Sequence, residues 1–286
     1  MKKDSTGVVV GRVFITIILV ITLGLASIGA ALRATFFNTK SWRELLTSDA
    51  FIDILMEDAD IEELTEDPIL KDELDEDFFT DYAHFCVNEL VDVIESGDTD
   101  IDEDALDDLY DEYLEDLFYE YATPAERAEF KDEFYDAVCD SVEEAADDLE
   151  ESGFFEFKEN FNKGFIVYMG ITVVMSAVLI AVMLLISKDK FAAIRNTGIA
   201  LTVCEALNGI GIAGIGGLLT LAFKEADEKD LGKLFSDFVA KQTGIALFIL
   251  GALLALGIFL IIFSAISKKN AAMVSDESDG VIVEEG

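Results

Sequence analysis

The chain has 286 residues, of which 52% are hydrophobic and 27% are charged, and its formal net charge at pH 7 is −38. Such amounts of both kinds of residue indicate separate apolar and charged segments, within a length that allows two domains, rather than one ordinary core. The negative charge argues against nucleic acid as a ligand, because its phosphates would be repelled.

Four long apolar segments divide the chain. They are residues 13–32, 164–186, 198–223 and 243–266. Each has about 20 residues or more, enough for a helix to cross roughly 30 Å of hydrocarbon. We therefore predict an all-α protein with four transmembrane helices, the first of them an uncleaved signal anchor. A cleaved signal sequence is the alternative, and it would place the next segment on the same side.

The segments between the predicted spans indicate which way the protein crosses the membrane. Bases lie in 1–12, in the loop 187–197 and in the tail 267–286, and the positive-inside rule makes this face cytoplasmic. Other bases lie on the opposite face, in 33–163 and in the amphipathic loop 224–242, so the rule alone is close to a tie. An inside-negative potential places the acidic segment outside. We expect a multi-pass protein of the cell membrane, with both termini inside and 33–163 extracellular.

The segment 33–163 holds nearly all of the acidity. Between Glu44 and Asn160, 45 acidic residues stand against four basic ones, a net charge of −41, whereas the rest of the chain carries +3. Apolar residues nevertheless recur here at helical spacing, from Phe51 to Leu64, Phe78 to Val93, Leu106 to Tyr121 and Phe130 to Leu149. Disordered acidic tracts lack such stripes. We predict an antiparallel bundle of about four helices whose surface is covered with carboxylates.

Local signals predict where these helices begin and end. Thr123 precedes a proline and is followed by Glu126, the pattern of a capping box, and an aspartate precedes Pro68 in a similar way. Gly97 and Gly153 lie where helices should stop.

The densest group of carboxylates begins like a calcium loop. It contains Asp98, Asp100, Asp102 and Asp104. The spacing resembles the start of an EF-hand, but Glu103 and Leu109 occupy the places of the required glycine and glutamate. Asp102 is also suited to cap the next helix. The sequence therefore predicts weak Ca²⁺ or Mg²⁺ binding here, and no other cofactor.

The cysteines and the single histidine limit the chemistry available to the acidic segment. Cys86 and Cys139 are the only cysteines outside the spans and could form a disulfide in an oxidising compartment, or remain two buried thiols. With His84 alone, no histidine-based metal site or serine–histidine–acid set can be assembled. Because no nucleophile with a base and no cofactor loop emerges either, we expect a protein that is not an enzyme.

Glu205 is the one ionisable residue deep within a predicted span. Thr202 and Asn208 are expected to share its helical face. A lone carboxyl in hydrocarbon favours its neutral form, unless it faces water. Two interpretations stay open: a protonated glutamate that joins helices, or a site that carries protons or cations.

The third span is also rich in glycine. Gly209, Gly211 and Gly214 match a nucleotide-binding motif by letter, but no strand precedes them, which excludes that reading. Gly209, Ala213 and Gly217 recur every four residues and predict a ridge for close helix packing.

Two hypotheses for function follow from these observations. The preferred one is a membrane protein, held in the lipid bilayer, whose acidic domain binds or senses cations or a basic extracellular partner through its negative field. The alternative is a cation channel or transporter with an acidic vestibule and Glu205 as its intramembrane site. A path through four spans per chain would require a homo-oligomer.

Overall fold

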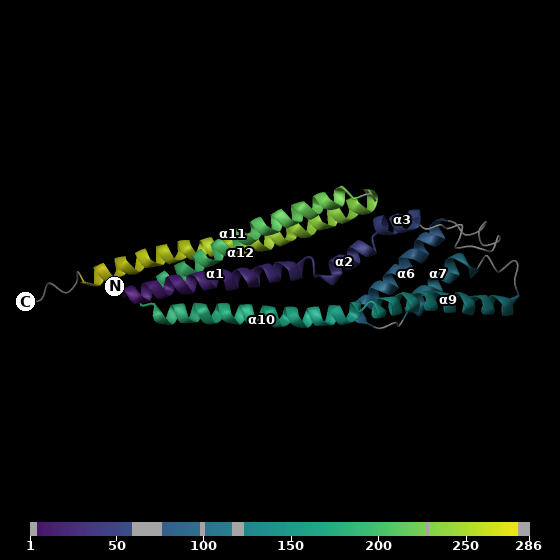
Figure 1. Ribbon diagram of the computed structural model, residues 1–286, viewed down its shortest axis with the longest axis horizontal. Helices are drawn as coiled ribbons and strands as arrows, with labels where there is room; N and C mark the ends of the chain where they lie inside the picture. The colour runs from purple at the N-terminus through teal and green to yellow at the C-terminus, as the bar shows by residue number, and fades with distance from the viewer. Residues whose placement is uncertain (1–4, 59–75, 98–100, 116–122, 227–228, 280–286) are drawn as a thin grey trace, which may run out of the picture. The chain divides into compact units, whose positions relative to one another are not determined.

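The computed structural model describes residues 5–58, 76–97, 101–115, 123–226 and 229–279. Within these ranges the regular structure is α-helical, as predicted, and there is no strand. The chain divides into two compact units, whose helices are labelled in Figure 1. We call Met1–Phe37, Gly164–Lys224 and Ser236–Gly286 the apolar unit, and Asn38–Lys163 with Glu225–Phe235 the acidic unit.

The apolar unit contains the predicted spans. They belong to α1 (Thr6–Ala34), α10 (Phe154–Ile186), α11 (Lys190–Lys224) and α12 (Lys229–Asp279). All four helices are long and apolar enough to cross a membrane, which is compatible with a multi-pass membrane protein. Large apolar side chains such as Leu185 and Phe248 are 80% and 77% exposed, as expected for helices surrounded by lipid rather than water.

The helices of the apolar unit extend beyond the apolar segments. The segment 187–197 between the second and third spans includes the start of α11, which begins at Lys190. The amphipathic segment 224–242 includes the start of α12, which begins at Lys229 and continues into the tail after the fourth span. Hydropathy marks the residues suited to lipid, whereas a helix continues until its backbone is interrupted, so the two boundaries need not coincide.

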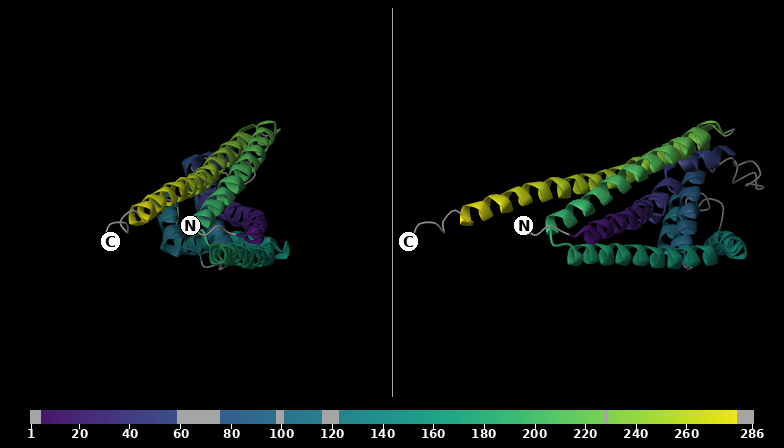
Figure 2. Two further views of the ribbon diagram at one scale, coloured as in Figure 1. Left: turned by 90° about the vertical axis from the view of Figure 1, so that its left-hand side faces the viewer. Right: turned by 60° about the vertical axis from the view of Figure 1, so that its left-hand side comes forward.

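Within the apolar unit, α1 packs with the other three spans. One buried cluster joins it to α10 and α11 through Leu19, Met183, Ala193 and Ala200. A second cluster joins it to α11 and α12 through Ala31, Ile212, Ala246 and Leu250. Figure 2 shows α11 and α12 alongside each other from two further directions. The first span is therefore an integral part of this packing.

The first part of α1 and the Lys268 region of α12 lie at the same end of the apolar unit, near the turn between α10 and α11. Thr16 near the start of α1 contacts Met183 near the end of α10, with Oγ1 and Sδ 3.9 Å apart. Lys268 of α12 forms an ion pair of 2.7 Å with Asp189, in the turn between α10 and α11. Burial alone would raise the pKa of Asp189, but hydrogen bonds from Lys268 and the Ala192 amide hold it below its ordinary value. With four spans, the first and the last helix are expected to have their outer ends on the same side.

The acidic unit is built from shorter helices. They are α2 (Thr39–Leu46), α3 (Asp49–Asp58), α6 (Glu76–Ser96), α7 (Glu103–Tyr113) and α9 (Pro124–Glu151). The Thr123–Glu126 capping box is present, and Gly97 and Gly153 adopt φ of +77° and +74° at helix ends, as predicted. The predicted helix start at Pro68 lies outside the described residues, as does the end of the stripe from Leu106 to Tyr121.

Aromatic side chains form the core of the acidic unit. Phe78 on α6 packs edge-on against Tyr113 on α7, with 5.5 Å between ring centroids. Tyr110 on α7 lies 6.0 Å from Phe134 on α9. Leu106, fully buried, belongs to one cluster with Phe85 of α6 and Val138 of α9. The predicted stripes therefore face one another, which buries the apolar side chains and leaves the opposite faces to solvent.

Candidate functional site

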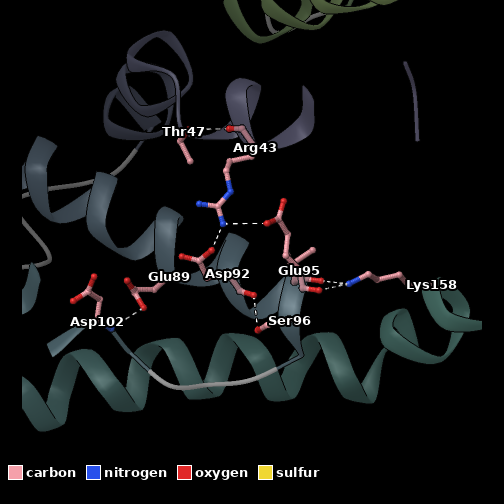
Figure 3. Close-up of polar contacts among 9 residues, drawn as sticks. Arg43, Thr47, Glu89, Asp92, Glu95, Ser96, Asp102 and Lys158 are labelled. Carbon is pink, nitrogen blue, oxygen red and sulfur yellow. Dashed lines mark hydrogen bonds and ion pairs between the residues drawn. The ribbon is translucent and has the colours of Figure 1, made fainter. Parts of the chain in front are cut away.

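The few bases of the acidic unit join its helices. Arg43 on α2 forms ion pairs with Asp92 and Glu95 on α6, the second at 3.2 Å. Figure 3 shows the Arg43 guanidinium next to both carboxylates. His84 on α6 lies 3.6 Å from Asp49 on α3. These contacts hold α2 and α3 against α6.

Lys131 on α9 makes a similar clamp to α7. Its Nζ lies 2.6 Å from Asp107 and 3.9 Å from Asp111, above the rings of Tyr110 and Tyr135. The Tyr135 hydroxyl donates a hydrogen bond to the same Asp107 carboxylate. The hydrogen bond from Lys131 lowers the pKa of Asp107, and the same bond raises the pKa of Lys131. Both groups are thereby held in their charged forms.

Lys158 caps the end of α6. Its ammonium donates to the backbone carbonyls of Ile94 and Glu95, the latter at 3.1 Å, as Figure 3 shows. The last carbonyls of a helix have no partner within the helix and carry a partial negative charge, so a cation is favourable there. With Arg43 and Lys131, this makes three bases of the acidic segment that serve contacts between helices.

Glu89 is a buried carboxylate that the sequence analysis missed. It is 6% exposed, and its Oε2 accepts a hydrogen bond of 3.2 Å from the Asp102 amide at the start of α7. Burial raises the pKa of Glu89, partly offset by that hydrogen bond and reinforced by the negative charge of Asp102. A carboxylate in a strongly acidic sequence gives no signal of burial.

The outer side of α9 carries a continuous row of exposed carboxylates. They are Asp132, Glu133, Asp136, Asp140, Glu143, Glu144, Asp147 and Asp148, which we call the α9 acidic face. Their spacing places them on one side of the helix, opposite the buried Val138, Val142 and Ala146. Within the described part of the chain, none of these carboxylates has a basic partner. Their charge is therefore directed to solvent.

The predicted calcium loop is described only in part. Asp98 and Asp100 lie outside the described residues. Asp102 caps α7, because its Oδ1 accepts a hydrogen bond of 3.1 Å from the Ala105 amide, and Asp104 is exposed in the first turn. No group of three or more potential metal ligands occurs among the residues that the structure describes. Weak Ca²⁺ or Mg²⁺ binding at this segment stays a prediction.

Cys86 and Cys139 are both free thiols in the structure. Burial raises the pKa of each thiol, and nearby carboxylates raise the pKa of Cys139 further. A raised pKa keeps the thiol protonated and slows attack on other sulfurs. The structure holds both as free thiols, and their pairing in an oxidising compartment stays a prediction.

Glu205 lies at the contact between α1 and α11. It is 1% exposed, and its Oε1 accepts a hydrogen bond of 3.5 Å from the Cys204 thiol. Asn208 donates to the Gly24 carbonyl at 2.8 Å and to the Ser27 hydroxyl at 3.0 Å. The carboxyl oxygen Oε2 has no hydrogen-bond partner among the described residues. Asn208, Ser27 and the Gly24 carbonyl thus form one polar cluster between α11 and α1, next to the buried Glu205.

Thr202 does not belong to this cluster, although it was predicted to share the face of Glu205. Its hydroxyl donates to the Gly198 carbonyl of its own helix at 2.8 Å, and it lies against Gly257 of α12. Six residues separate it from Asn208, about one and two-thirds turns, so the two residues point to different neighbours. The Tyr168 hydroxyl of α10 donates to the Leu25 carbonyl of α1 at 2.7 Å.

The close helix contacts use different glycines from those predicted. A Cβ on Gly198 would lie 2.7 Å from the Gly257 carbonyl oxygen, so α11 and α12 meet backbone to backbone there. Around Gly217, by contrast, no atom lies within 4 Å of such a Cβ, and at Gly209 only Leu247 reaches 4.0 Å. The predicted ridge from Gly209 to Gly217 is therefore not a close contact within the described chain.

Two groups of residues are thus candidates for function. The α9 acidic face is exposed and carries unpaired charge, whereas the cluster around Glu205 is enclosed and has no base near it. No protein-family model, curated protein or solved structure matches the chain.

Proposed function

We propose that this is a non-enzymatic integral membrane protein whose acidic unit lies outside the cell and binds a basic partner, with cations competing for the same carboxylates. The observation that carries the proposal is the α9 acidic face. Because Arg43, Lys131 and Lys158 are engaged between helices, they leave that face uncompensated. An uncompensated row of like charges attracts a surface of opposite charge and speeds its approach.

The shape of the α9 acidic face favours an extended partner over a single ion. From Asp132 to Asp148 it covers about 24 Å along the helix, at a rise of 1.5 Å per residue. A bound ion needs several oxygens within about 2.6 Å of itself, which exposed side chains on one convex helix do not provide. A basic peptide or protein surface can meet many of these carboxylates at once.

Binding to a basic peptide tests the proposal directly. The full chain in lipid nanodiscs is titrated with a lysine-rich peptide, and Asp140, Glu143, Glu144 and Asp147 are neutralised together by Asn and Gln. We expect binding to weaken with added salt and to drop in this variant.

A matched control removes the same charge from a different helix. Neutralising the exposed Glu103, Asp104, Asp108 and Glu112 of α7 changes the net charge equally but leaves the α9 acidic face intact. A smaller loss of binding in this control supports the α9 assignment. If wild-type protein does not bind the peptide at low salt, the proposed function is wrong.

The outer location is tested by labelling intact cells. In a background without native cysteines, a single cysteine replaces the exposed Ser141 of α9, and a second variant carries it at the exposed Lys188 of the α10–α11 turn. We expect an impermeant thiol reagent to modify the first without lysis and the second only after lysis. The reverse pattern would place the acidic unit in the cytoplasm.

A further inference from the structure

Exposed bases gather at the end of the apolar unit where α10 turns into α11. We call this set the basic end, and its members are Lys188, Lys190, Arg195, Lys268 and Lys269. Asp189 is the only acidic residue in the stretches 180–204 and 250–275. The next one on α12 is Asp276, about 10 Å beyond Lys269 along the helix. In a chain of strongly negative charge, this end is therefore locally positive.

Two bases of this set are already used by the helices themselves. Lys268 forms its ion pair of 2.7 Å with Asp189, and the other oxygen of that carboxylate accepts a hydrogen bond of 3.2 Å from the Ala192 amide at the start of α11. Lys190 donates to the Leu184 carbonyl near the end of α10, where carbonyls lack partners within the helix. Asp189 thus compensates Lys268, and Lys190 caps α10.

Arg195 and Lys269 are not used in this way. Both are exposed, and neither has an ion-pair or hydrogen-bond partner among the residues that the structure describes. Arg195 lies one turn before Gly198, whose added Cβ would meet the Ile261 amide nitrogen of α12 at 3.0 Å, so it belongs to the side of α11 that faces α12. Lys269 follows the ion-paired Lys268. Two uncompensated cations therefore flank the line along which α11 and α12 meet.

Large apolar side chains next to the basic end are exposed as well. Leu185, at the end of α10, is 80% exposed, and Ile266, less than one turn before Lys269, is 56% exposed. Cations beside exposed hydrocarbon suit a ligand that has an anionic group and apolar chains. A phosphate ion would use only the cations, whereas an anionic phospholipid would use both parts of this surface.

We propose that the basic end binds the phosphate group of an anionic phospholipid, with its acyl chains against the exposed apolar side chains of α10 and α12. Arg195 and Lys269 supply the uncompensated charge, and the planar Arg195 guanidinium is suited to hold two phosphate oxygens at once. The proposal rests on the membrane location given under the proposed function, but not on what the α9 acidic face binds.

Native mass spectrometry of the full chain in detergent micelles counts the lipids that stay bound. The probes are phosphatidylglycerol and phosphatidylcholine with identical acyl chains, which differ in net charge. We expect wild-type protein to retain phosphatidylglycerol preferentially, and this preference to weaken as ammonium acetate is raised. Arg195→Gln combined with Lys269→Gln should lower the preference by about tenfold or more, because each base near an anionic surface strengthens binding roughly fivefold.

A matched control removes two bases from the other end of α12. Lys229→Gln combined with Lys233→Gln changes the net charge equally at exposed positions, and it should leave the preference for phosphatidylglycerol intact. Equal retention of the two lipids by wild-type protein, or an equal loss in both pairs of variants, would overturn the proposal.

A variant of opposite sign guards against loss of binding through misfolding. Asp189→Asn keeps an acceptor for the Ala192 amide but removes the charge that compensates Lys268, so phosphatidylglycerol should bind more tightly. A protein damaged in its fold would not gain affinity. Unchanged or weaker binding in Asp189→Asn would contradict an electrostatic site here.

Inorganic phosphate distinguishes the two sources of the anionic group. At an ionic strength matched with chloride, excess phosphate should not displace phosphatidylglycerol, because it makes no apolar contacts. Displacement would make the basic end a site for the phosphate ion and overturn the lipid assignment. Binding of the lysine-rich peptide to the acidic unit is a separate measurement, so a failure of one proposal is told apart from a failure of the other.

Discussion

The two units bury different kinds of side chain where their helices meet. In the acidic unit, α6, α7 and α9 meet through rings such as Phe78, Tyr110 and Phe134. In the apolar unit, α11 meets α1 and α12 at Gly24, Gly198 and other small residues. Burying a large apolar side chain is favourable for helices in water, whereas helices in lipid gain little from it and associate by close backbone approach. The same chain thus uses two packing rules, each suited to one solvent.

The units also differ in how they treat polar groups. The acidic unit uses charges exposed to water, such as the contact of Lys131 with Asp107, to connect helices. Within its spans, the apolar unit uses neutral hydrogen bonds to backbone carbonyls, such as that of Asn208 with Gly24, and its ion pair between Lys268 and Asp189 lies at the end of the helices. A substitution that disturbs packing in one unit should therefore leave the stability of the other unit unchanged. Trp42 reports on the acidic unit and Cys204 on the apolar unit.

The largest effect is expected from a cavity in the acidic unit. Leu106→Ala removes a fully buried side chain and should destabilise this unit by about 2–5 kcal/mol. Trp42 is the only tryptophan of the chain and lies on α2, so its fluorescence follows the unfolding of the acidic unit. Heating the full chain should show an earlier Trp42 transition, with exposure of Cys204 in the apolar unit unchanged. If exposure of Cys204 also shifts, the units are not independent.

The next largest effect is expected from a substitution that disturbs the apolar unit instead. Gly198→Ala forces a methyl group against the Gly257 carbonyl and should cost about 1–3 kcal/mol, seen as earlier thermal exposure of Cys204 with an unchanged Trp42 transition. Gly211→Ala on the same helix is the control, because no atom lies within 4 Å of its added methyl group. It should be neutral or slightly stabilising, since alanine favours helix. Equal loss in both variants would contradict the backbone contact.

A smaller effect should follow from removing a clamp. Lys131→Met loses the ion pair and ring contacts of a partly exposed ammonium and should destabilise the acidic unit by about 1 kcal/mol near neutral pH. Lys163→Met, which breaks only an exposed pair with Glu159 within one helix, should change the Trp42 transition less.

The effect of Lys131→Met should also depend on pH. The pKa of Asp107 is lowered in the folded protein, so the clamp stabilises above the ordinary carboxyl pKa and is lost as pH falls through the lowered value. The difference between wild type and Lys131→Met should therefore vanish in acid. A difference that persists there would assign the effect to packing of the lysine stem.

The smallest effect is expected at Glu89. Its raised pKa means that its contribution is most favourable below the ordinary carboxyl pKa and is lost as pH rises through the raised value. Glu89→Gln keeps an acceptor for the Asp102 amide and removes the buried charge. The variant should therefore be slightly more stable than wild type at pH 7, and the two should converge in acid. Trp42 fluorescence measures both, and a less stable variant at pH 7 would show that the charge itself is needed.

Local sequence rules accounted for the ends of the acidic helices and for the number of spans. A capping box at Thr123 and glycines at 97 and 153 act within one turn of chain, so their outcome does not depend on distant neighbours. Long apolar stretches identify spans for the same reason.

Contacts that depend on which helices lie next to each other could not be predicted from the sequence. Helical spacing gave Glu89 no reason to be buried, because its partner is a backbone amide at the start of another helix. Spacing also selected Gly209 and Gly217 for close contact, whereas contact falls at Gly198, because periodicity does not say which neighbour a face meets. Glu205 and Asn208 could be singled out, but the bond from Asn208 to Ser27 required knowing that α1 lies against α11.

The α9 acidic face also bears on how copies of this protein share a membrane. Its exposed carboxylates have no basic partner among the described residues, and the chain as a whole carries a net charge of −38. Neighbouring copies therefore repel one another through their acidic units over about 10 Å at 0.1 M salt, and over roughly 30 Å at 0.01 M. Ionic strength should consequently control how these proteins cluster in the plane of the bilayer. Molecules should stay apart at low salt and approach more closely at high salt, where counterions screen the carboxylates.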